Sequence, residues 1–460
     1  MKRIRMKRIR KSVSHARRQF LKAAASATAM AAFALSGAVS GASAQDALGT
    51  ADKPVELRIM ANESYANLWR TSLVPEFNKT FKNIKVTVDG VPYAEQLAKE
   101  LLDATSATPS YDILLVDDPW IPQLAAIGAL MDLKGKEIAA WTAPDYDWAD
   151  FHPAPLAAGE WKGVQYGLPV RSNMLLMFYN RTLYKKAGLP EPTPKLTWDE
   201  FFAQAPKLVQ DTKGGGKPDA WAVDTYFVRN QLTPTIWQAI LNANGGRLLD
   251  DSGKAAFNSE AGIKSLDTHR RLLEFAPPGA LSHGFTESLQ AFRQGVVATV
   301  FQWGSGFKAS AVDEKSTTLK FEEVGIQVMP VGSASAGTHR GIWNVSISAK
   351  SQHKQAAWTF LQWLTSKKGE IFDLETTGAF PARKSTLTAK PDSAWLVPVL
   401  AALQQAYDVA EKGQMWRIRH PKSDAAQQIL ADEVARALAG QVSSAEALKI
   451  AADKINRTLR

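Results

Sequence analysis

The sequence has 460 residues, of which 45% are hydrophobic and 22% are charged, and it contains no cysteine. This composition is that of a globular protein with two or three compact units, and it excludes a disordered chain. The absence of cysteine excludes a disulfide scaffold, thiolate metal sites, a cysteine nucleophile and a lipid attached through cysteine.

The formal net charge of +10 would by itself favour a nucleic-acid or membrane partner. However, residues 1–44 contain ten lysines and arginines and no acidic residue, so the rest of the chain has 45 basic and 45 acidic residues. A nucleic-acid interface needs a basic surface on the folded domain. The sequence therefore predicts no nucleic-acid partner.

The first 44 residues have the organisation of an export signal. A basic stretch is followed by an uncharged run that ends in Ala42-Ser43-Ala44, and this ending predicts cleavage near Ala44. The run is rich in alanine, serine and glycine, which argues against a membrane anchor. Arg17-Arg18-Gln19-Phe20-Leu21-Lys22 resembles the twin-arginine signal. This resemblance implies that the twin-arginine translocase exports the folded protein to the periplasm.

Beyond the signal, strand-like and helix-like segments alternate, which predicts an α/β fold. The first predicted elements are strands over 55–60, 84–88 and 113–116 and helices over 68–81 and 93–104. Ile113–Val116 is an unbroken apolar run, as in a buried parallel strand. This order predicts the start of a doubly wound sheet, which binds its ligand at the carboxyl ends of the strands.

The later part of the chain continues the same alternation. The predicted elements are strands over 174–178, 296–301, 324–328 and 342–347 and helices over 354–364 and 425–439. Thr197, followed by Glu200 three residues later, predicts a helix start with a capping box. After the signal, no segment has the roughly 18 consecutive apolar residues that a membrane span requires.

Patterns for cofactor and metal chemistry are weak. Gly304-Ser305-Gly306-Phe307-Lys308-Ala309 fits the dinucleotide pattern G-x-G-x-x-A, but a tight turn after a strand explains the same residues. The seven histidines are scattered and show no metal-ligand spacing. We therefore expect no cofactor and no metal, and a nucleotide-binding oxidoreductase remains a third hypothesis.

Asp117 and Asp118 directly follow the buried strand. Adjacent residues point to different sides, whereas the two carboxylates of a glycosidase must flank one bond from opposite faces. Two neighbouring acids at this position are more typical of a helix cap or a ligand clamp. A secreted glycoside-processing enzyme remains the alternative hypothesis.

Tryptophan is the positive signal for a ligand. The fourteen tryptophans outnumber the nine tyrosines, and Trp303 and Trp343 stand where loops meet strands. An indole offers a flat apolar face and one N–H donor, which suits the C–H faces and hydroxyl edges of sugars and polyols. Each of these two tryptophans could equally be a core residue.

A series of short segments resembles family 1 of the extracellular solute-binding proteins of ABC importers, the group that includes the maltose-binding protein. Each segment is weak alone, but together they follow the family's order over nearly all of the chain beyond the signal. They are residues 111–114, 128–133, 161–169, 179–181, 186–189, 197–201, 291–295, 325–330, 356–361 and 445–448.

This resemblance implies two doubly wound α/β lobes joined by a hinge of several crossovers, like a type II periplasmic binding protein, that close on a ligand. Transferred to this sequence, residues 1–44 are the signal peptide. Lobe one is 45–170 plus 323–383, and lobe two is 171–322 plus 384–460. The implied function is to capture a sugar or sugar alcohol in the periplasm and deliver it to an ABC permease in the inner membrane. It involves no catalysis, and we expect a monomer.

The candidate ligand-binding residues come from strand ends and from the hinge. In lobe one, strand ends select Glu63, Tyr65, Asp117, Asp118, Trp343 and Asn344. In the crossover, Arg171 is expected at the cleft floor by family resemblance, either as an ion pair between lobes or as a donor to the ligand. In lobe two, Tyr226, Trp237 and Trp303 would form an aromatic platform, although Trp237 could instead lie in a buried helix.

Overall fold

The computed structural model describes residues 47–412 and 416–460, so the predicted export signal lies outside the described residues. The chain divides after Val55 into two units, and the sheet and helices belong to the second. In the described ranges, no helix has both the length and the apolar character needed to cross a bilayer.

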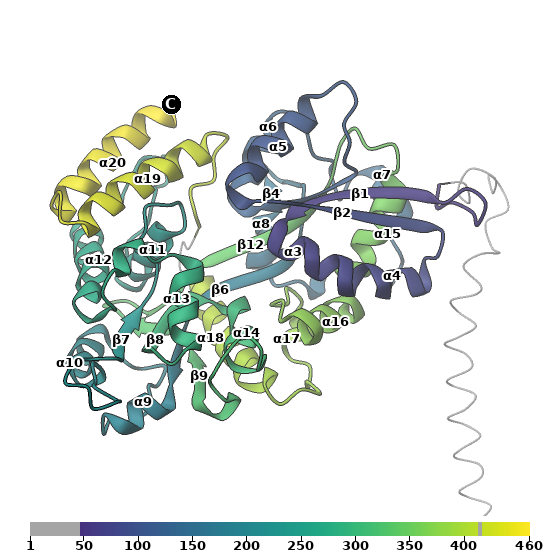
Figure 1. The fold of residues 1–460 in the computed structure, drawn as a ribbon. Coiled ribbons are helices and arrows are strands. Elements are labelled where there is room, and N and C mark those ends of the chain that lie inside the picture. Colours follow the sequence, from purple (N-terminus) through teal and green to yellow (C-terminus); the bar gives the residue numbers. More distant parts are fainter. Residues whose placement is uncertain (1–46, 413–415) are drawn as a thin grey trace, which may run out of the picture. The chain divides into compact units, whose positions relative to one another are not determined.

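One mixed sheet of eight strands organises the second unit. Its strand order is β2-β1-β3-β12-β6-β8-β7, with β9 paired to β6 beside this path (Figure 1). The strands are β1 (Val55–Asn62), β2 (Ile84–Val91), β3 (Ile113–Asp117), β6 (Leu168–Asn180), β7 (Trp221–Asp224), β8 (Val297–Trp303), β9 (Val324–Gln327) and β12 (Arg340–Ile347). The predicted α/β class is confirmed.

Strands β6 and β12 join two groups of strands. The first strand group is β2, β1 and β3, and the second is β8, β7 and β9. All 13 residues of β6 are buried. Its beginning pairs with β12, whereas residues 175–180 pair with β8 and β9. A stretch of strand that is covered on both faces is favoured to be apolar, which explains the dense run Met174–Phe178.

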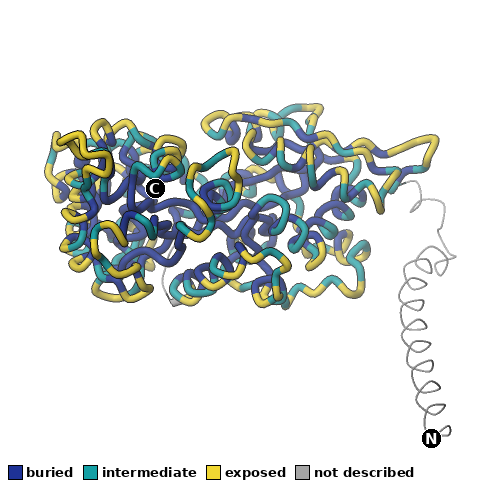
Figure 2. Tube along the Cα trace, turned by 60° about the horizontal axis from the view of Figure 1, so that its bottom comes forward, coloured by how far each residue is buried: buried dark blue, intermediate teal, exposed yellow. Residues whose placement is uncertain are grey.

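Helices cover both faces of the second strand group, as doubly wound packing requires. On one face, α10, α11, α12, α19 and α20 share a core with Phe301. On the other face, α13, α14 and α18 share a core with Phe178. Figure 1 shows α19 and α20 side by side, in agreement with their packing contacts. Figure 2 shows that much of the inner trace is buried, while exposed residues gather on turns and outer helix faces.

The helices are α3 (Glu63–Leu68), α4 (Val74–Thr80), α5 (Tyr93–Thr105), α6 (Ile121–Ala126), α7 (Lys136–Trp141), α8 (Pro153–Ala158), α9 (Arg181–Lys186), α10 (Trp198–Leu208), α11 (Thr233–Ala243), α12 (Glu260–Arg271), α13 (Phe285–Arg293), α14 (Phe307–Ala311), α15 (Lys354–Leu364), α16 (Lys367–Thr377), α17 (Lys384–Leu387), α18 (Leu396–Lys412), α19 (Ser423–Leu438) and α20 (Ser444–Thr458). Short strands β4 (Glu160–Trp161) and β5 (Val164–Gln165) form one hairpin, and β10 (Met329–Val331) and β11 (Ala336–Gly337) form another.

Three local predictions can be compared directly. The predicted capping box of Thr197 and Glu200 is confirmed at the start of α10. The glycine pattern at Gly304–Gly306 forms one 3₁₀ turn before the five-residue α14, as the tight-turn interpretation predicts. The helix predicted over 68–81 is interrupted by a π-helical segment, Trp69–Leu73. The reason is Pro75, which has no N–H to continue the regular ladder.

The predicted lobe boundaries remain a prediction, but the strand pairing bears on one of them. Strand β9 pairs with the Met177–Asn180 end of β6, and Val324 and Ile326 pack in the same core as α18. Residues 324–327 therefore lie with the second strand group, although the sequence analysis assigned them to lobe one. The C-terminal helices α18, α19 and α20 also pack on the second strand group.

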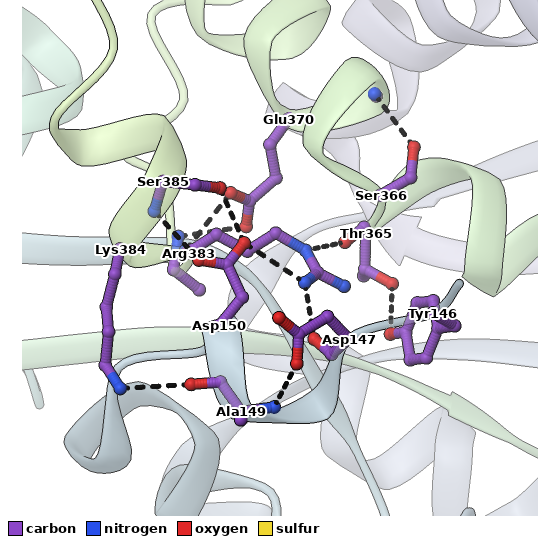
Figure 3. A network of polar contacts seen from close by, with 12 residues as sticks. Tyr146, Asp147, Ala149, Asp150, Thr365, Ser366, Glu370, Arg383, Lys384 and Ser385 are labelled. Atoms are coloured by element: carbon purple, nitrogen blue, oxygen red, sulfur yellow. Dashed lines mark hydrogen bonds and ion pairs between the residues drawn. The ribbon is translucent and has the colours of Figure 1, made fainter. Parts of the chain in front are cut away.

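A buried arginine fixes the chain segment that runs beside β6 (Figure 3). The Arg383 guanidinium donates to the carbonyls of Thr365 and Asp147, at 2.6 and 2.7 Å. Glu370 accepts the backbone N–H groups of Ala382 and Arg383, at 3.0 and 3.1 Å. The segment held in this way places the carbonyl of Phe380 where it accepts the N–H of Ser172 in β6, at 3.0 Å.

Helix α5 is attached to β3 by a buried polar pair. The side-chain amide of Gln96 donates to the carbonyl of Leu115 at 2.6 Å and to the carboxyl of Glu100 at 2.9 Å. Glu100 is fully buried, and burial raises its pKa to about 8. The folded protein therefore holds a proton on Glu100 that the unfolded chain releases near pH 4.5.

This proton predicts a pH-dependent stability. The contribution of Glu100 is fully present below pH 4.5 and is lost as the pH rises to about 8. Each unit of pKa shift corresponds to about 1.4 kcal/mol. The free energy of unfolding should therefore fall by a few multiples of this amount as the pH rises through this range. Glu100→Gln should lack this loss in urea unfolding at a series of pH values. Glu95→Gln, on the exposed face of the same helix, should behave like wild type. If the free energy of unfolding changed with pH equally in wild type, Glu100→Gln and Glu95→Gln, the assignment of the proton to Glu100 would be wrong.

Candidate ligand-binding site

The carboxyl end of β3 brings two buried acids against an arginine from the far C-terminal part of the chain. The Arg417 guanidinium donates to both carboxylate oxygens of Asp117, at 2.8 and 2.5 Å, and it also pairs with Asp118. All three side chains are at most 4% exposed. Tyr93 donates its hydroxyl to Asp117 at 2.9 Å, so the carboxylate of Asp117 is held from two sides.

Asp118 has a second role in the backbone. One of its carboxylate oxygens accepts the N–H of Ile342 in β12, at 3.1 Å. Burial raises the pKa of Asp118, and the positive charge of Arg417 opposes that effect. Burial would also lower the pKa of Arg417, but the two aspartates raise it well above its usual value. We therefore treat the three groups as one ionised unit, the Arg417 triad.

Four aromatic rings lie beside this triad and form what we call the aromatic cluster: Tyr65, Tyr93, Trp120 and Trp343. Trp343 meets the other three rings edge-on, at centroid distances of 5.4, 5.9 and 5.9 Å. Tyr93 stacks on Trp120 at 5.2 Å. Edge-to-face and stacked rings fix one another's orientation, so the indole of Trp343 is held rigidly.

Sheet register explains why these groups meet. Trp343 in β12 lies opposite Asp117 in β3 and opposite Arg171 in β6. Residues directly opposite one another in a sheet present their side chains on the same face. Asp117, Trp343 and Arg171 thus form one row across three strands. The β12–β6 register shifts between Trp343 and Asn344, and such irregularities re-aim side chains.

Arg171 takes part in a buried ion pair, and its predicted role as an ion pair between lobes stays a prediction. Its guanidinium lies 3.4 Å from Asp373 and donates to Thr377 at 3.0 Å, both in α16. It also lies over the ring of Tyr65, 4.4 Å from the centroid. The residue is buried, and its Nε has no hydrogen-bond partner in the described part of the chain. A contact between Arg171 and a ligand remains a prediction.

The candidates from the second strand group lie at the ends of β7 and β8. The Tyr226 hydroxyl bonds to the side chain of Gln302 and accepts the N–H of Trp303 at 3.4 Å. Trp303 ends β8 and is 6% exposed. Its ring packs closely on Gly341, where an added Cβ would lie 2.8 Å from the indole. A glycine at 341 is therefore needed for this ring position.

Trp237 lies in the core, as the buried-helix alternative predicts. Its indole N–H donates to the carbonyl of Gly262 at 3.1 Å, and its ring meets Phe257 edge-on at 5.5 Å. Glu63 is exposed at the first position of α3. Asn344 is fully buried, and its amide donates to the carbonyl of Ile342 at 3.4 Å. A ligand-binding role for these three residues remains a prediction.

The sequence analysis missed the segment that joins the two halves of the site. Ile418 packs into the core with α19, whereas Arg417 reaches the acids of β3. Arg419 donates to the carbonyls of Ala157 and Ala158, at 3.1 and 3.0 Å. The alternation Trp-Arg-Ile-Arg at 416–419 was the available signal, because an extended segment would send Ile418 and the two arginines to opposite sides.

Comparison with known proteins assigns the family. A profile of the bacterial extracellular solute-binding proteins matches residues 63–371, and the chain belongs to this family. The "Probable amino-acid ABC transporter periplasmic-binding protein y4oP" of Sinorhizobium fredii is 29% identical over 378 residues, which are 80% of this chain and 83% of the relative. The mannitol-binding protein of Pseudomonas aeruginosa is 28% identical over 232 residues, 48% of this chain and 50% of the relative.

Among solved structures, the solute-binding protein of an ABC transporter from Agrobacterium radiobacter K84, in complex with ribitol, superposes with a TM-score of 0.75. It is 29% identical, and the match covers 88% of this chain and 100% of that protein. The fold is therefore that of the type II periplasmic binding proteins, as predicted. The chain is an ABC-transporter solute-binding protein, and its family and relatives are periplasmic or extracellular binding proteins.

The Arg417 triad predicts that replacing Arg417 strongly lowers the stability of the protein. Arg417→Met removes the only ion-pair partner of Asp118 among the described residues and leaves two buried carboxylates unpaired. Loss of one partner from a buried ion pair costs about 3–5 kcal/mol, which urea unfolding at pH 7 would measure. The charge-balanced variant Asp117→Asn, Asp118→Asn, Arg417→Met should recover most of that loss. A single Arg417→Met variant within about 1 kcal/mol of wild type, as for a surface pair, would contradict the buried triad.

Proposed function

We propose that this protein captures a neutral sugar or sugar alcohol in the periplasm and delivers it to an ABC permease in the inner membrane. The observation that carries this proposal is the joint placement of the Arg417 triad and the aromatic cluster at the carboxyl end of β3. Rigid aromatic faces suit the C–H surfaces of a polyol, and charged groups at their edge suit its hydroxyls.

The pairing of the buried carboxylates of this site with arginines of the protein supports a ligand without a net charge. Asp117 and Asp118 are paired with Arg417, and Asp373 is paired with Arg171. Each of these buried carboxylates already has a guanidinium partner within the protein. A hydroxyl group can still bond to the remaining lone pairs and N–H groups of such pairs, because it both donates and accepts.

An amino acid is the second candidate, because one relative carries that term in its name. Binding an amino acid needs a buried carboxylate for the ammonium group and a cation for the carboxylate. In this site both would first have to be released from the pairs described above. The ribitol complex of one structural relative and the name of the mannitol-binding relative favour the polyol.

The chain topology supports a closing motion of two lobes about β6 and β12. We propose that the first strand group with α3–α8 and α15 forms lobe one, and that the second group with α9–α14 and α18–α20 forms lobe two. The segment of α16 and α17 contacts both, because Arg383 donates to the carbonyl of Asp147 and Leu374 packs in the core shared with α18. A ligand that contacts both lobes only in the closed form would shift the equilibrium toward that form. The permease would then recognise the closed form.

A purely binding role is favoured over glycoside processing. A general acid or nucleophile must be free to exchange a proton or attack the substrate. Arg417 holds both Asp117 and Asp118. We therefore propose no catalysis for this site. We further propose a monomer that is exported by the twin-arginine translocase and cleaved near Ala44.

The ligand class is tested with the mature protein, residues 45–460, by thermal shift and titration against ribitol, D-mannitol, common monosaccharides and an amino-acid panel. A polyol or sugar at tenfold excess over its Kd should stabilise the protein by roughly 1.4 kcal/mol. Trp343→Leu should weaken binding at least tenfold, because it removes the central ring of the aromatic cluster.

The matched control is Trp358→Leu in α15, where the ring stacks on Trp148 instead. That variant should lower the melting temperature and leave the affinity of the folded protein unchanged. A shift with an amino acid and none with any sugar or polyol would replace the proposed ligand class by the second candidate.

The export route is tested in the full-length precursor. The double substitution Arg17→Lys, Arg18→Lys should leave the precursor in the cytoplasm, because the translocase requires the arginine pair. The control replaces Arg8 and Arg10 by lysine in the same basic stretch and should be exported normally. Immunoblots of periplasmic and cytoplasmic fractions give the readout, and normal periplasmic amounts of the first double variant would refute this route.

A further inference from the structure

One buried histidine takes part in none of the polar contacts described above. His339 directly precedes β12 and is 1% exposed. Neither of its ring nitrogens has a hydrogen-bond partner among the described residues. Its backbone is fixed, since its carbonyl accepts the N–H of Leu175 at 2.9 Å. The imidazole is therefore held in place by a rigid chain, yet the described part of the chain offers neither of its polar atoms a hydrogen-bond partner.

Buried polar atoms without partners are rare in native proteins, and each calls for an explanation. The other fully buried histidine makes the contrast clear. His269 bonds through Nε2 to the carbonyl of Tyr226, at 3.0 Å, and its ring packs on Phe227. That contact anchors His269 in the core, whereas no comparable polar contact explains His339.

The neighbours of His339 place it in the candidate site. Its ring centroid lies 6.1 Å from that of Trp303 at the end of β8. Burial lowers the pKa of His339 well below its usual value, and the nearby charges of Arg417 and Arg340 lower it further. The imidazole is therefore neutral at physiological pH. It lies beside Trp303 and close enough to Arg417 to be influenced by that charge.

We propose that His339 is a ligand-binding residue whose neutral imidazole hydrogen-bonds a hydroxyl group of the ligand beside the ring of Trp303. This inference rests on the proposed function and adds a specific contact to it. A neutral imidazole has one N–H donor and one acceptor nitrogen. A hydroxyl satisfies either nitrogen in either tautomer, whereas an ammonium group could only donate and would be repelled by Arg417 and Arg340.

The proposal predicts effects of opposite sign on stability and affinity. His339→Phe keeps a flat ring of similar size and removes both unpaired polar atoms. Replacement of an unsatisfied buried polar group by an apolar one is neutral or stabilising. The melting temperature of the ligand-free variant should therefore be unchanged or higher. Its Kd for the best sugar or polyol should rise at least tenfold, because the hydroxyl of the ligand loses its partner.

A purely structural histidine would behave differently. If internal contacts used the nitrogens of His339, the phenylalanine variant would melt at a lower temperature while the folded fraction kept its affinity. The matched control is His269→Phe, which breaks the bond to Tyr226. It should lower the melting temperature and leave the Kd unchanged. Unchanged affinity in His339→Phe overturns the proposal, whatever its melting temperature.

A second measurement needs no substitution. In ¹⁵N spectra of the wild-type protein labelled at histidine, ligand should shift the ring nitrogens of His339 and leave those of His269 unchanged. If His339→Phe loses both stability and affinity, these spectra decide, and unshifted His339 nitrogens at saturating ligand overturn the proposal. If wild type binds no sugar or polyol in the thermal-shift panel, the proposed function fails first, and that result is distinct from either outcome for His339.

Discussion

The rest of the site depends on how the protein neutralises two adjacent carboxylates at the end of a buried strand. Removing Asp117 and Asp118 from water is costly, and only a geometrically good partner offsets that cost. The partner is Arg417, which follows Asp117 by 300 residues. To deliver it, the segment after α18 must run from the core of the second strand group, where Ile418 is anchored, to the end of β3. The path of the C-terminal chain is thus tied to the charges on β3.

The pairing of the buried acids with arginines is also the basis of the ligand class proposed for this site. Because Arg417 pairs with Asp117 and Asp118 and Arg171 pairs with Asp373, each of these buried carboxylates already has a guanidinium partner within the protein. What remains is the aromatic cluster, with donors and acceptors at its edge. Such a surface distinguishes ligands by their shape and hydroxyl pattern instead of by charge. The neutral imidazole of His339, which has no hydrogen-bond partner in residues 47–412 and 416–460, would add to a surface of this kind without changing its charge.

Local sequence patterns predicted those features of the structure that depend only on neighbouring residues, such as strands, turns and helix caps. The apolar run before Asp117 indicated a buried strand. The rule of carboxyl-end binding selected both acids and Trp343 for the same half of the predicted site, and the structure places Trp343 opposite Asp117. The same patterns could not distinguish Trp343 from Trp237, since both indoles are almost fully buried and only tertiary contacts separate a ring in the cluster from a ring in the core. Arg417 was missed because its partners are distant in sequence, and His339 was missed because an unsatisfied atom is visible only in three dimensions.

The row formed by Asp117, Trp343 and Arg171 would connect the proposed ligand binding to the proposed hinge. These residues lie opposite one another on β3, β12 and β6, and two of these three strands also join the strand groups. Twisting or bending of β6 against β12 must therefore move Arg171 relative to Trp343 and Asp117. The contact of Arg171 with Tyr65 and its pair with Asp373 in α16 would change in the same motion. A ligand seated on this row would respond directly to the angle between the strand groups, because the strands proposed to hold the ligand are also the strands proposed to bend.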